Sequence, residues 1–339
     1  MRVGIIGVGR AGKIHLEAWN AVEGVEVQAI SDRSSSVRRW ARDIGLRAYS
    51  DPLDMIAREP LDAVSVATPP ILHAPVTVAC LERNLDVLCE KPLAINGREG
   101  LKMLRTATRL KRQLVLATKF RHVPDLVAAR ELIAAGEIGE PVAFEIDFSS
   151  MVDMSGRWNS RRALAGGGVI IDNGCHAFDI VAFLFGTVAR VHATRLKSLQ
   201  SIAVEDSATI LVAAGRGLIG RIDLSWSLAT GRETYVTVYG SRGTIEVGWR
   251  GSRLRVAGRP TVQIGSGYDK GDAHRHMMTA FRDLVLGNAV GPWISPGECL
   301  RTVAAVEAAY QSLRSGGWVS VDMMGMRESR PQPAAEATA

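Results

Sequence analysis

A glycine-rich stretch, AGGGVIIDNGCHAFD, combines three consecutive glycines with two acidic side chains and a histidine. If the segment from Asp172 to Phe185 forms one helix, Asp172, His176 and Asp179 share one face of it. A histidine with a carboxylate one turn away is suited to act as a general base near neutral pH. The alternative is a helix-capping Asp172 beside a buried histidine with no chemical role.

A lysine in DVLCEKPLA follows directly after a short apolar run that is typical of a buried strand. The segment places Glu90, Lys91 and Pro92 at the carboxyl end of that strand, which is the edge where doubly wound sheets bind ligands. A partly desolvated lysine there can donate a hydrogen bond to a hydroxyl and stabilise a developing alkoxide. Taken alone, Lys91 is better explained as a surface lysine at a strand end.

The glycine loop GVGRAG follows the first apolar run and opens the first predicted helix. In this context Gly7 permits a tight turn, Gly9 lets the backbone approach a pyrophosphate, and Gly12 allows close packing of helix on strand. The helix N-terminus, with Arg10 and Ala11, adds partial positive charge where phosphates would lie. The loop therefore predicts a bound dinucleotide.

The second predicted strand ends in an acidic residue, Asp32. A carboxylate there meets a ribose 2′-hydroxyl and would repel a 2′-phosphate, which favours NAD over NADP. Arg33 beside it is able to stack on adenine or to pair with a 2′-phosphate, so the preference for NAD stays an expectation. Thr68, Pro69 and His73, after the next strand, are expected to wall the nicotinamide side, although His73 alone is typical of a helix start.

The elements that carry these residues alternate in type over the first ~120 residues. Apolar runs at 3–6, 25–31, 63–68, 86–90 and 114–118 are separated by helical patterns at 11–22, 35–44, 71–84 and 96–111. Alternation of this kind predicts an α/β fold with a doubly wound parallel sheet covered on both faces. Asn96 is a good N-cap for the last of these helices.

The pattern changes after Phe120. A helix is expected at 125–136 and a strand at 141–150, followed by the glycine stretch and its helix. Successive strand-like runs between 190 and 265 predict a large, mostly antiparallel open sheet with one covered face. Helices at 273–287 and from Ser295, which starts a Ser-Pro-Gly-Glu capping box, precede a short last strand. We thus expect a nucleotide-binding domain at 1–119, an α+β domain at 120–325 and a disordered tail at 326–339.

Composition excludes several other classes of protein. The formal net charge of +6 is spread along the chain without an aromatic-interleaved basic patch, so we expect no nucleic-acid partner. No apolar run reaches the ~18 residues of a membrane span. The four cysteines show no CxxC pairing or metal-ligand spacing, which suits reduced, buried thiols in a cytoplasmic protein. Cys175 points ~100° away from His176 on a helix, so a Cys–His nucleophile is not expected. No second histidine at ligand spacing accompanies His176, so no metal site is expected.

Three motifs occur in one order: the G-x-G-x-x-G loop, Glu-Lys-Pro, and GGG-x-x-x-D-x-G-x-H-x-x-D. Together with KFRHVP and YGSRGTIEV they resemble the Gfo/Idh/MocA oxidoreductase family, which includes glucose–fructose oxidoreductase and inositol dehydrogenases. The resemblance runs from Arg2 to about Asp322. It implies a Rossmann domain followed by an α+β domain whose sheet forms homodimer or homotetramer contacts.

The resemblance also implies the residues of the active site. Lys91, Asp172 and His176 would be the catalytic set, and the Lys91–Pro92 bond would be cis. The expected function is hydride transfer between nicotinamide and a secondary hydroxyl of a sugar, cyclitol or aminoglycoside-like derivative. The rim candidates are Arg121, Arg157, Trp158, Asn159, Arg162 and Asn173.

Two alternatives remain open from the sequence. A redox-cycling glycosidase would use tightly bound NAD to cleave a glycoside. A non-catalytic dinucleotide-binding regulator would not need all three catalytic residues. The glycine triplet, Gly166 to Gly168, is expected to press against the cofactor ring or the other domain, where a Cβ would clash. Phe178, Val181, Ala182 and Phe185 would bury the opposite face of the helix.

Overall fold

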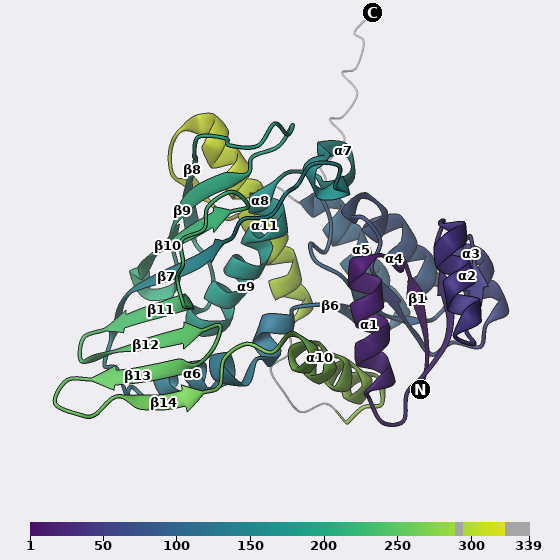
Figure 1. Ribbon diagram of the computed structural model, residues 1–339, viewed down its shortest axis with the longest axis horizontal. Helices are drawn as coiled ribbons and strands as arrows, with labels where there is room; N and C mark the ends of the chain where they lie inside the picture. The colour runs from purple at the N-terminus through teal and green to yellow at the C-terminus, as the bar shows by residue number, and fades with distance from the viewer. Residues whose placement is uncertain (289–293, 323–339) are drawn as a thin grey trace, which may run out of the picture.

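The first sheet of the computed structural model, which describes residues 1–288 and 294–322, has six parallel strands in the order β3-β2-β1-β4-β5-β6 (Figure 1). This arrangement confirms the predicted doubly wound parallel sheet. The strands are β1 (Arg2–Ile6), β2 (Glu26–Ser31), β3 (Arg47–Tyr49), β4 (Ala63–Val66), β5 (Asp86–Cys89) and β6 (Leu114–Leu116). The sequence pattern misses β3 because three residues, one of them a charged Arg47, are too short to show periodicity.

Helices cover both faces of this sheet, as its continuous apolar strands require. They are α1 (Arg10–Asn20), α2 (Ser35–Asp43), α3 (Pro52–Arg58), α4 (His73–Glu82) and α5 (Gly97–Leu110), with the 3₁₀ turn η1 (Pro70–Leu72) before α4. The Asn96 side chain caps α5 by accepting a hydrogen bond from the Glu99 amide at 2.9 Å. The cap confirms the predicted helix start.

The second sheet has nine strands in the order β14-β13-β12-β11-β7-β10-β9-β8-β15. Its pairs are antiparallel except β7 with β10, so the predicted, mostly antiparallel open sheet is confirmed. The strands are β7 (Pro141–Ser149), β8 (Arg190–Arg195), β9 (Ser207–Ala213), β10 (Ile219–Ser225), β11 (Thr234–Gly240), β12 (Gly243–Gly248), β13 (Ser252–Val256), β14 (Val262–Gly265) and β15 (Val319–Ser320).

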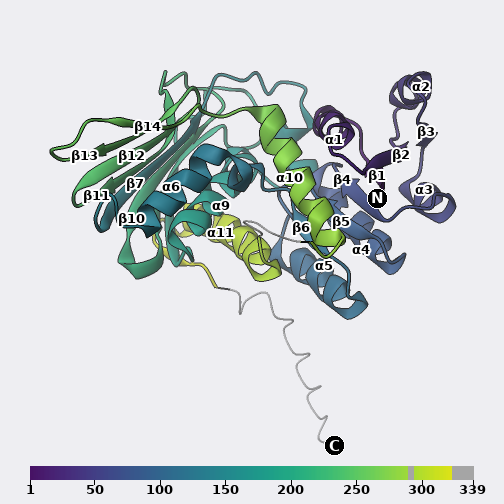
Figure 2. The same cartoon turned by 90° about the horizontal axis from the view of Figure 1, so that it is seen from below.

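Helices lie against one face of the nine-stranded sheet and leave the other open (Figure 2). Phe144 and Ile146 of β7 point into this covered core, where Phe144 stacks on Phe185 at 4.9 Å. The covering elements are α6 (Pro124–Ala134), α9 (Gly174–Phe185) and α11 (Pro296–Ser315). The predicted capping box at the start of α11 forms between Ser295 and Glu298. Shorter pieces connect them: η2 (Lys119–His122), η3 (Trp158–Ser160), α7 (Arg162–Ala165), α8 (Val169–Asp172) and η4 (Gly215–Gly217).

One late helix, α10 (Lys270–Val285), lies beside α1 of the first sheet in both views (Figures 1 and 2). Phe281 meets the Trp19 ring edge-on at 6.1 Å, and both side chains are fully buried. Residues at the start of α11, such as Leu300, also belong to the core of the first sheet. The two cores therefore share helices that come late in the chain. The predicted tail, 326–339, lies outside the described residues.

No single helix in residues 1–288 and 294–322 is long and apolar enough to cross a membrane. One bent pair, Arg162–Asp172 with Gly174–Phe185, passes by length and composition alone. The α9 half of this pair is the buried core helix described above.

Candidate active site

A cavity of about 730 Å³ opens where the carboxyl ends of the parallel strands face the second sheet. Ligands of doubly wound folds bind at this edge. Most of the residues predicted for the site line the cavity: Gly7, Gly9, Arg10, Ala11, Asp32, Thr68, Pro69, Glu90, Lys91, Arg157, Trp158, Asn159, Asp172, Asn173 and His176. Gly12, Arg33, His73, Arg121 and Arg162 are not among its lining residues.

Lys91 and Asp172, which are far apart in the sequence, form an ion pair in this cavity. The Lys91 Nζ lies 2.6 Å from Asp172 Oδ1 and also donates to the Asp172 carbonyl at 3.0 Å. Burial alone would lower the pKa of Lys91, but the adjacent Asp172 carboxylate overcomes this and raises it above the usual value. Lys91 is therefore a fixed cation, and the Lys91–Pro92 peptide bond is cis, as expected.

His176 lies in the first turn of α9 and faces the same cavity. Burial lowers the pKa of His176 well below its usual value, and the nearby charges of Lys91 and Lys119 lower it further. The imidazole is thus neutral at pH 7 and able to accept a proton. The ring of Phe120 packs edge-on against it at 5.1 Å and limits its orientation.

The predicted single helix from Asp172 is interrupted. α8 ends at Asp172 and α9 begins at Gly174, with a bend of 43° between the helical segments on either side of Asn173. At this break the Asn173 Nδ2 donates to the Phe148 carbonyl at 3.4 Å. Because of the bend, Asp172 turns toward Lys91 while His176 still lines the cavity.

Asp179 does not join the polar face that the helical spacing predicts. It is buried and pairs with the Arg121 guanidinium at 2.8 Å. Arg121 is itself 2% exposed and also donates to Glu298 at 3.0 Å, so the structure places it in the interior between η2, α9 and α11. The expectation that Arg121 borders the substrate is wrong because its side chain is engaged beneath α9. Arg162, another rim candidate, is exposed on α7 outside the cavity.

Glu90 is held beneath Lys91 by a buried histidine. His15 Nε2 lies 2.9 Å from Glu90 Oε1, and Glu90 Oε2 accepts from the Lys91 amide at 3.0 Å. Burial would raise the pKa of Glu90, but the hydrogen bond with His15 and the charge of Lys91 hold it below the usual range. Sequence reasoning missed His15, although it follows the glycine loop by three residues and points from α1 to the carboxyl ends of the strands.

The glycine loop has the geometry that a dinucleotide requires. Gly7 has a positive φ of 84°, and a Cβ on Gly12 would lie 2.0 Å from the Gly7 carbonyl oxygen. A Cβ on Gly9 would meet nothing within 4 Å, so this backbone faces open space above the N-terminus of α1. These residues fit a pyrophosphate at the helix N-terminus.

Asp32 lies at the end of β2 and lines the cavity. Its carboxylate accepts hydrogen bonds from the Val8 amide at 2.7 Å and the Ser34 amide at 2.8 Å. Arg33 next to it is exposed and outside the lining, while Arg38 donates to the carbonyls of both residues. The carboxylate is therefore fixed in place at the position expected for a ribose contact.

His73 is a buried structural residue rather than part of the cavity wall. Its two ring nitrogens lie 2.7 Å from the Pro92 carbonyl and 2.8 Å from the Thr68 carbonyl. It joins the turns that follow β4 and β5 and begins α4, which agrees with its reading as a helix-start histidine. The expectation that it contacts the cofactor is wrong because both nitrogens are engaged.

The glycine triplet before α8 presses on protein side chains and backbone. A Cβ on Gly167 would lie 1.9 Å from the Tyr310 hydroxyl, and one on Gly168 would lie 2.1 Å from the Glu205 carbonyl. A Cβ on Gly166 would approach Ile95 of the first half of the chain at 3.2 Å. Close approach to the other domain is therefore found at one of the three glycines, and the remaining two pack within the second half.

Several lining residues lack a local sequence signal. They lie in or directly after strands of the second sheet, in η2, and in or just before α10: Phe120, Phe148, Trp226, Trp249, Tyr268, Lys270 and His274. Lys119 also lines the cavity, and it could have been found from the sequence because it follows β6, which ends at the ligand-binding edge of the sheet. The aromatic residues meet only through the fold.

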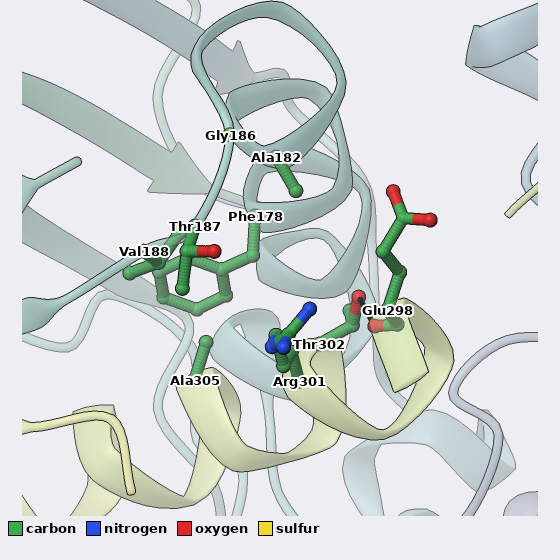
Figure 3. A pocket seen from close by; sticks show the side chains of 9 residues that line it. All are labelled: Phe178, Ala182, Gly186, Thr187, Val188, Glu298, Arg301, Thr302 and Ala305. Carbon is green, nitrogen blue, oxygen red and sulfur yellow. Dashed lines mark hydrogen bonds between the residues drawn. The ribbon is translucent and has the colours of Figure 1, made fainter. Parts of the chain in front are cut away.

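A smaller cavity of about 180 Å³ lies between α9 and α11 (Figure 3). Its floor is apolar, with Phe178 and Ala305, and Glu298 and Arg301 stand at its side. None of the predicted catalytic residues lines it. The larger cavity is therefore the candidate active site.

Comparisons with known proteins agree with this architecture. Residues 1–118 match an oxidoreductase family with an NAD-binding Rossmann fold, and residues 126–246 match the Gfo/Idh/MocA C-terminal domain. A D-apiose dehydrogenase of Paraburkholderia graminis is 29% identical over 340 residues, covering 94% of this chain and 88% of the relative. The rhizopine catabolism protein MocA of Rhizobium meliloti is 30% identical over 249 residues, covering 72% of this chain and 77% of that protein.

A solved structure shows the same fold over almost the whole chain. Levoglucosan dehydrogenase, in complex with NADH and levoglucosan, has a TM-score of 0.84 at 22% identity and covers 95% of this chain and 99% of that one. The fold and the matched regions define an oxidoreductase with an NAD-binding Rossmann domain. The chain belongs to the Gfo/Idh/MocA family.

Proposed function

We propose that this protein is an NAD-dependent dehydrogenase that oxidises a secondary hydroxyl of a sugar, cyclitol or aminoglycoside-like sugar derivative. The observation that carries the proposal is the meeting of Lys91, Asp172 and His176 in one cavity with the glycine loop. Relatives named D-apiose dehydrogenase and myo-inositol 2-dehydrogenase support this class of substrate.

In this proposal His176 is the acid/base group, because its neutral imidazole can take up the hydroxyl proton. The Lys91 ammonium stabilises the oxygen as it becomes an alkoxide, and Asp172 holds the ammonium in place. NAD, held along the glycine loop of Gly7, Gly9 and Gly12, would supply the hydride acceptor. Reduction of the ketone reverses the same proton transfers.

The other lining residues have binding roles in the proposal. Asp32 favours NAD, since its carboxylate would repel a 2′-phosphate. Trp158 is 39% exposed, so its ring is available to stack on a sugar face. Arg157, Asn159 and Asn173 complete the substrate rim.

The test is a panel of sugars and cyclitols followed at the NADH absorbance band, with NAD and NADP compared. Replacing His176 by Ala should lower kcat by about 10²–10⁴-fold, the usual value of one positioned acid/base group, and leave NAD affinity unchanged. His192→Ala on β8, which lies outside the cavity, is the matched control. Near-normal turnover by His176→Ala would contradict the assignment.

A further inference from the structure

A second lysine, Lys119, lies in the cavity without a carboxylate partner. It begins η2 immediately after β6, and its Nζ is 5.3 Å from the centre of the Phe120 ring and 5.6 Å from that of Tyr268. In the part of the chain that the structure describes, no hydrogen bond or ion pair joins this Nζ to another residue. Lys91, by contrast, is paired with Asp172.

The carboxylates that line the cavity are already engaged. Asp172 accepts from the Lys91 Nζ, Glu90 is bonded to His15, and Asp32 accepts from two backbone amides at the far end of the glycine loop. Among the described lining residues, the ammonium groups of Lys119 and Lys270 therefore have no bonded carboxylate, and Lys270 lies near Arg10 at the phosphate end. Buried charges in proteins are normally paired, so an anion supplied by a ligand would complete the arrangement.

The surroundings of Lys119 disfavour its charge when the cavity holds no anion. Burial lowers the pKa of Lys119 to about 8, and the charges of Lys91 and Lys270 contribute in the same direction. A bound carboxylate would raise it again. The titratable groups that face this lysine are Glu90, Lys91, Asp172, His176, Tyr268, Lys270 and His274.

Lys119 belongs to the catalytic end of the cavity. The Phe120 ring, which its ammonium approaches, packs on His176 at 5.1 Å. The phosphate end has its own positive groups, Arg10 and the N-terminus of α1. An anion on Lys119 is therefore part of the molecule that reacts at His176.

We infer that the substrate is a polyhydroxy acid, an aldonate or uronate, whose carboxylate is bound by Lys119. This inference rests on the proposed function. A secondary hydroxyl of the acid lies between Lys91 and His176. Its O–H proton passes to His176, the carbinol hydrogen leaves with its electron pair to NAD, and a keto acid and NADH form. The carboxylate is unchanged by the reaction and serves only for recognition.

The kinetic test compares acids with their neutral counterparts: galactonate with galactitol, and glucuronate with glucose. We expect a higher kcat/KM for the acids. Lys119→Met should lower it by about 10- to 100-fold through KM, the range for a hydrogen bond to a charged group. The neutral compounds offer Lys119 no carboxylate, so their kcat/KM should change much less and the preference for acids should be lost. Lys119→Arg should restore part of the loss, and Lys102→Met, an exposed lysine on α5, is the matched control. The inference would be overturned if the wild-type protein preferred the neutral compounds and Lys119→Met kept that preference. The proposed function would still stand in that case, because the neutral compounds would be oxidised.

Two further measurements, one of binding and one of pH dependence, test the same contact. Calorimetric titration of galactonate into the NADH-saturated wild-type protein should show heat of binding, and this heat should be absent in Lys119→Met. Equal affinity in the two proteins would overturn the inference. Because this measurement needs no turnover, it decides the inference even if no polyol is oxidised and the proposed function fails. The kcat/KM for an acid should also fall as pH rises through about 8, because Lys119 loses its proton there. That limb should be absent in Lys119→Arg, and its persistence there would count against the inference.

Discussion

At the scale of single residues, two of the basic groups in the cavity, Lys91 and His176, are held in opposite protonation states. Asp172 keeps Lys91 charged, whereas burial and the two lysines keep His176 neutral. When the pKa values of two groups are displaced in this way, one group can act as the acid and the other as the base at the same pH. The ammonium is suited to stabilise an oxyanion and the imidazole to accept a proton.

The pH dependence of oxidation follows from the state of His176. Its pKa is lowered, so the imidazole stays neutral until the pH falls well below 6.5, and activity should be lost only there. Lys119→Met removes a nearby positive charge, which favours the imidazolium and should move this acidic limb to higher pH. The profile of kcat/KM for a neutral polyol measures both effects, with Lys102→Met as the control. A wild-type limb at or above pH 6.5 would contradict the expected neutral state.

At the scale of elements, the glycine loop separates a packing role from a binding role. Gly12→Ala would place a methyl group 2.0 Å from the Gly7 carbonyl, so the free energy of unfolding should fall by about 1–3 kcal/mol. Gly9→Ala meets no atom within 4 Å and has an ordinary φ of −71°, so stability should be kept while NADH binding weakens. Urea denaturation and fluorescence titration with NADH measure the two quantities. Equal destabilisation by both variants would refute the separation.

The elements themselves could be predicted because their signals are local. Apolar runs gave five of the six parallel strands, and the capping residues Asn96 and Ser295 marked helix starts that the structure contains. Spacing alone could not show which side chains meet. Asp179 follows His176 by three residues, yet its partner Arg121 stands 58 residues earlier in the chain, so only the fold decides that it leaves the cavity. The break at Asn173 likewise depends on the Phe148 carbonyl from another element.

At the scale of the whole molecule, the open face of the nine-stranded sheet is a candidate contact between subunits. Leu211, Ile219 and Tyr239 are each more than a third exposed there, and register places Ile219 and Tyr239 beside Ala143. Charged pairs such as Arg221 with Glu145 border this apolar band. Sheet faces of this kind associate with a second copy when the apolar band is matched.

We therefore expect a homodimer or homotetramer in solution. Ile219→Asp would place an unpaired charge in the contact and should shift the protein to a smaller species in sedimentation velocity experiments. Leu53→Asp, at an exposed position on α3, is the control and should leave the assembly unchanged. A wild-type protein that sediments as a monomer would exclude this role for the sheet.

The sharing of α10 and α11 between the two cores has a consequence for biosynthesis. The six parallel strands are synthesised first. Trp19 cannot pack on Phe281, and Gly100 cannot pack on Leu300, until these later residues have been synthesised. At translation rates of about 5–20 residues per second, the nascent first half stays incompletely buried for roughly 10–40 s. Until then its apolar helix surfaces are open to chaperones, and a ribosome that stalls midway releases a fragment prone to aggregate.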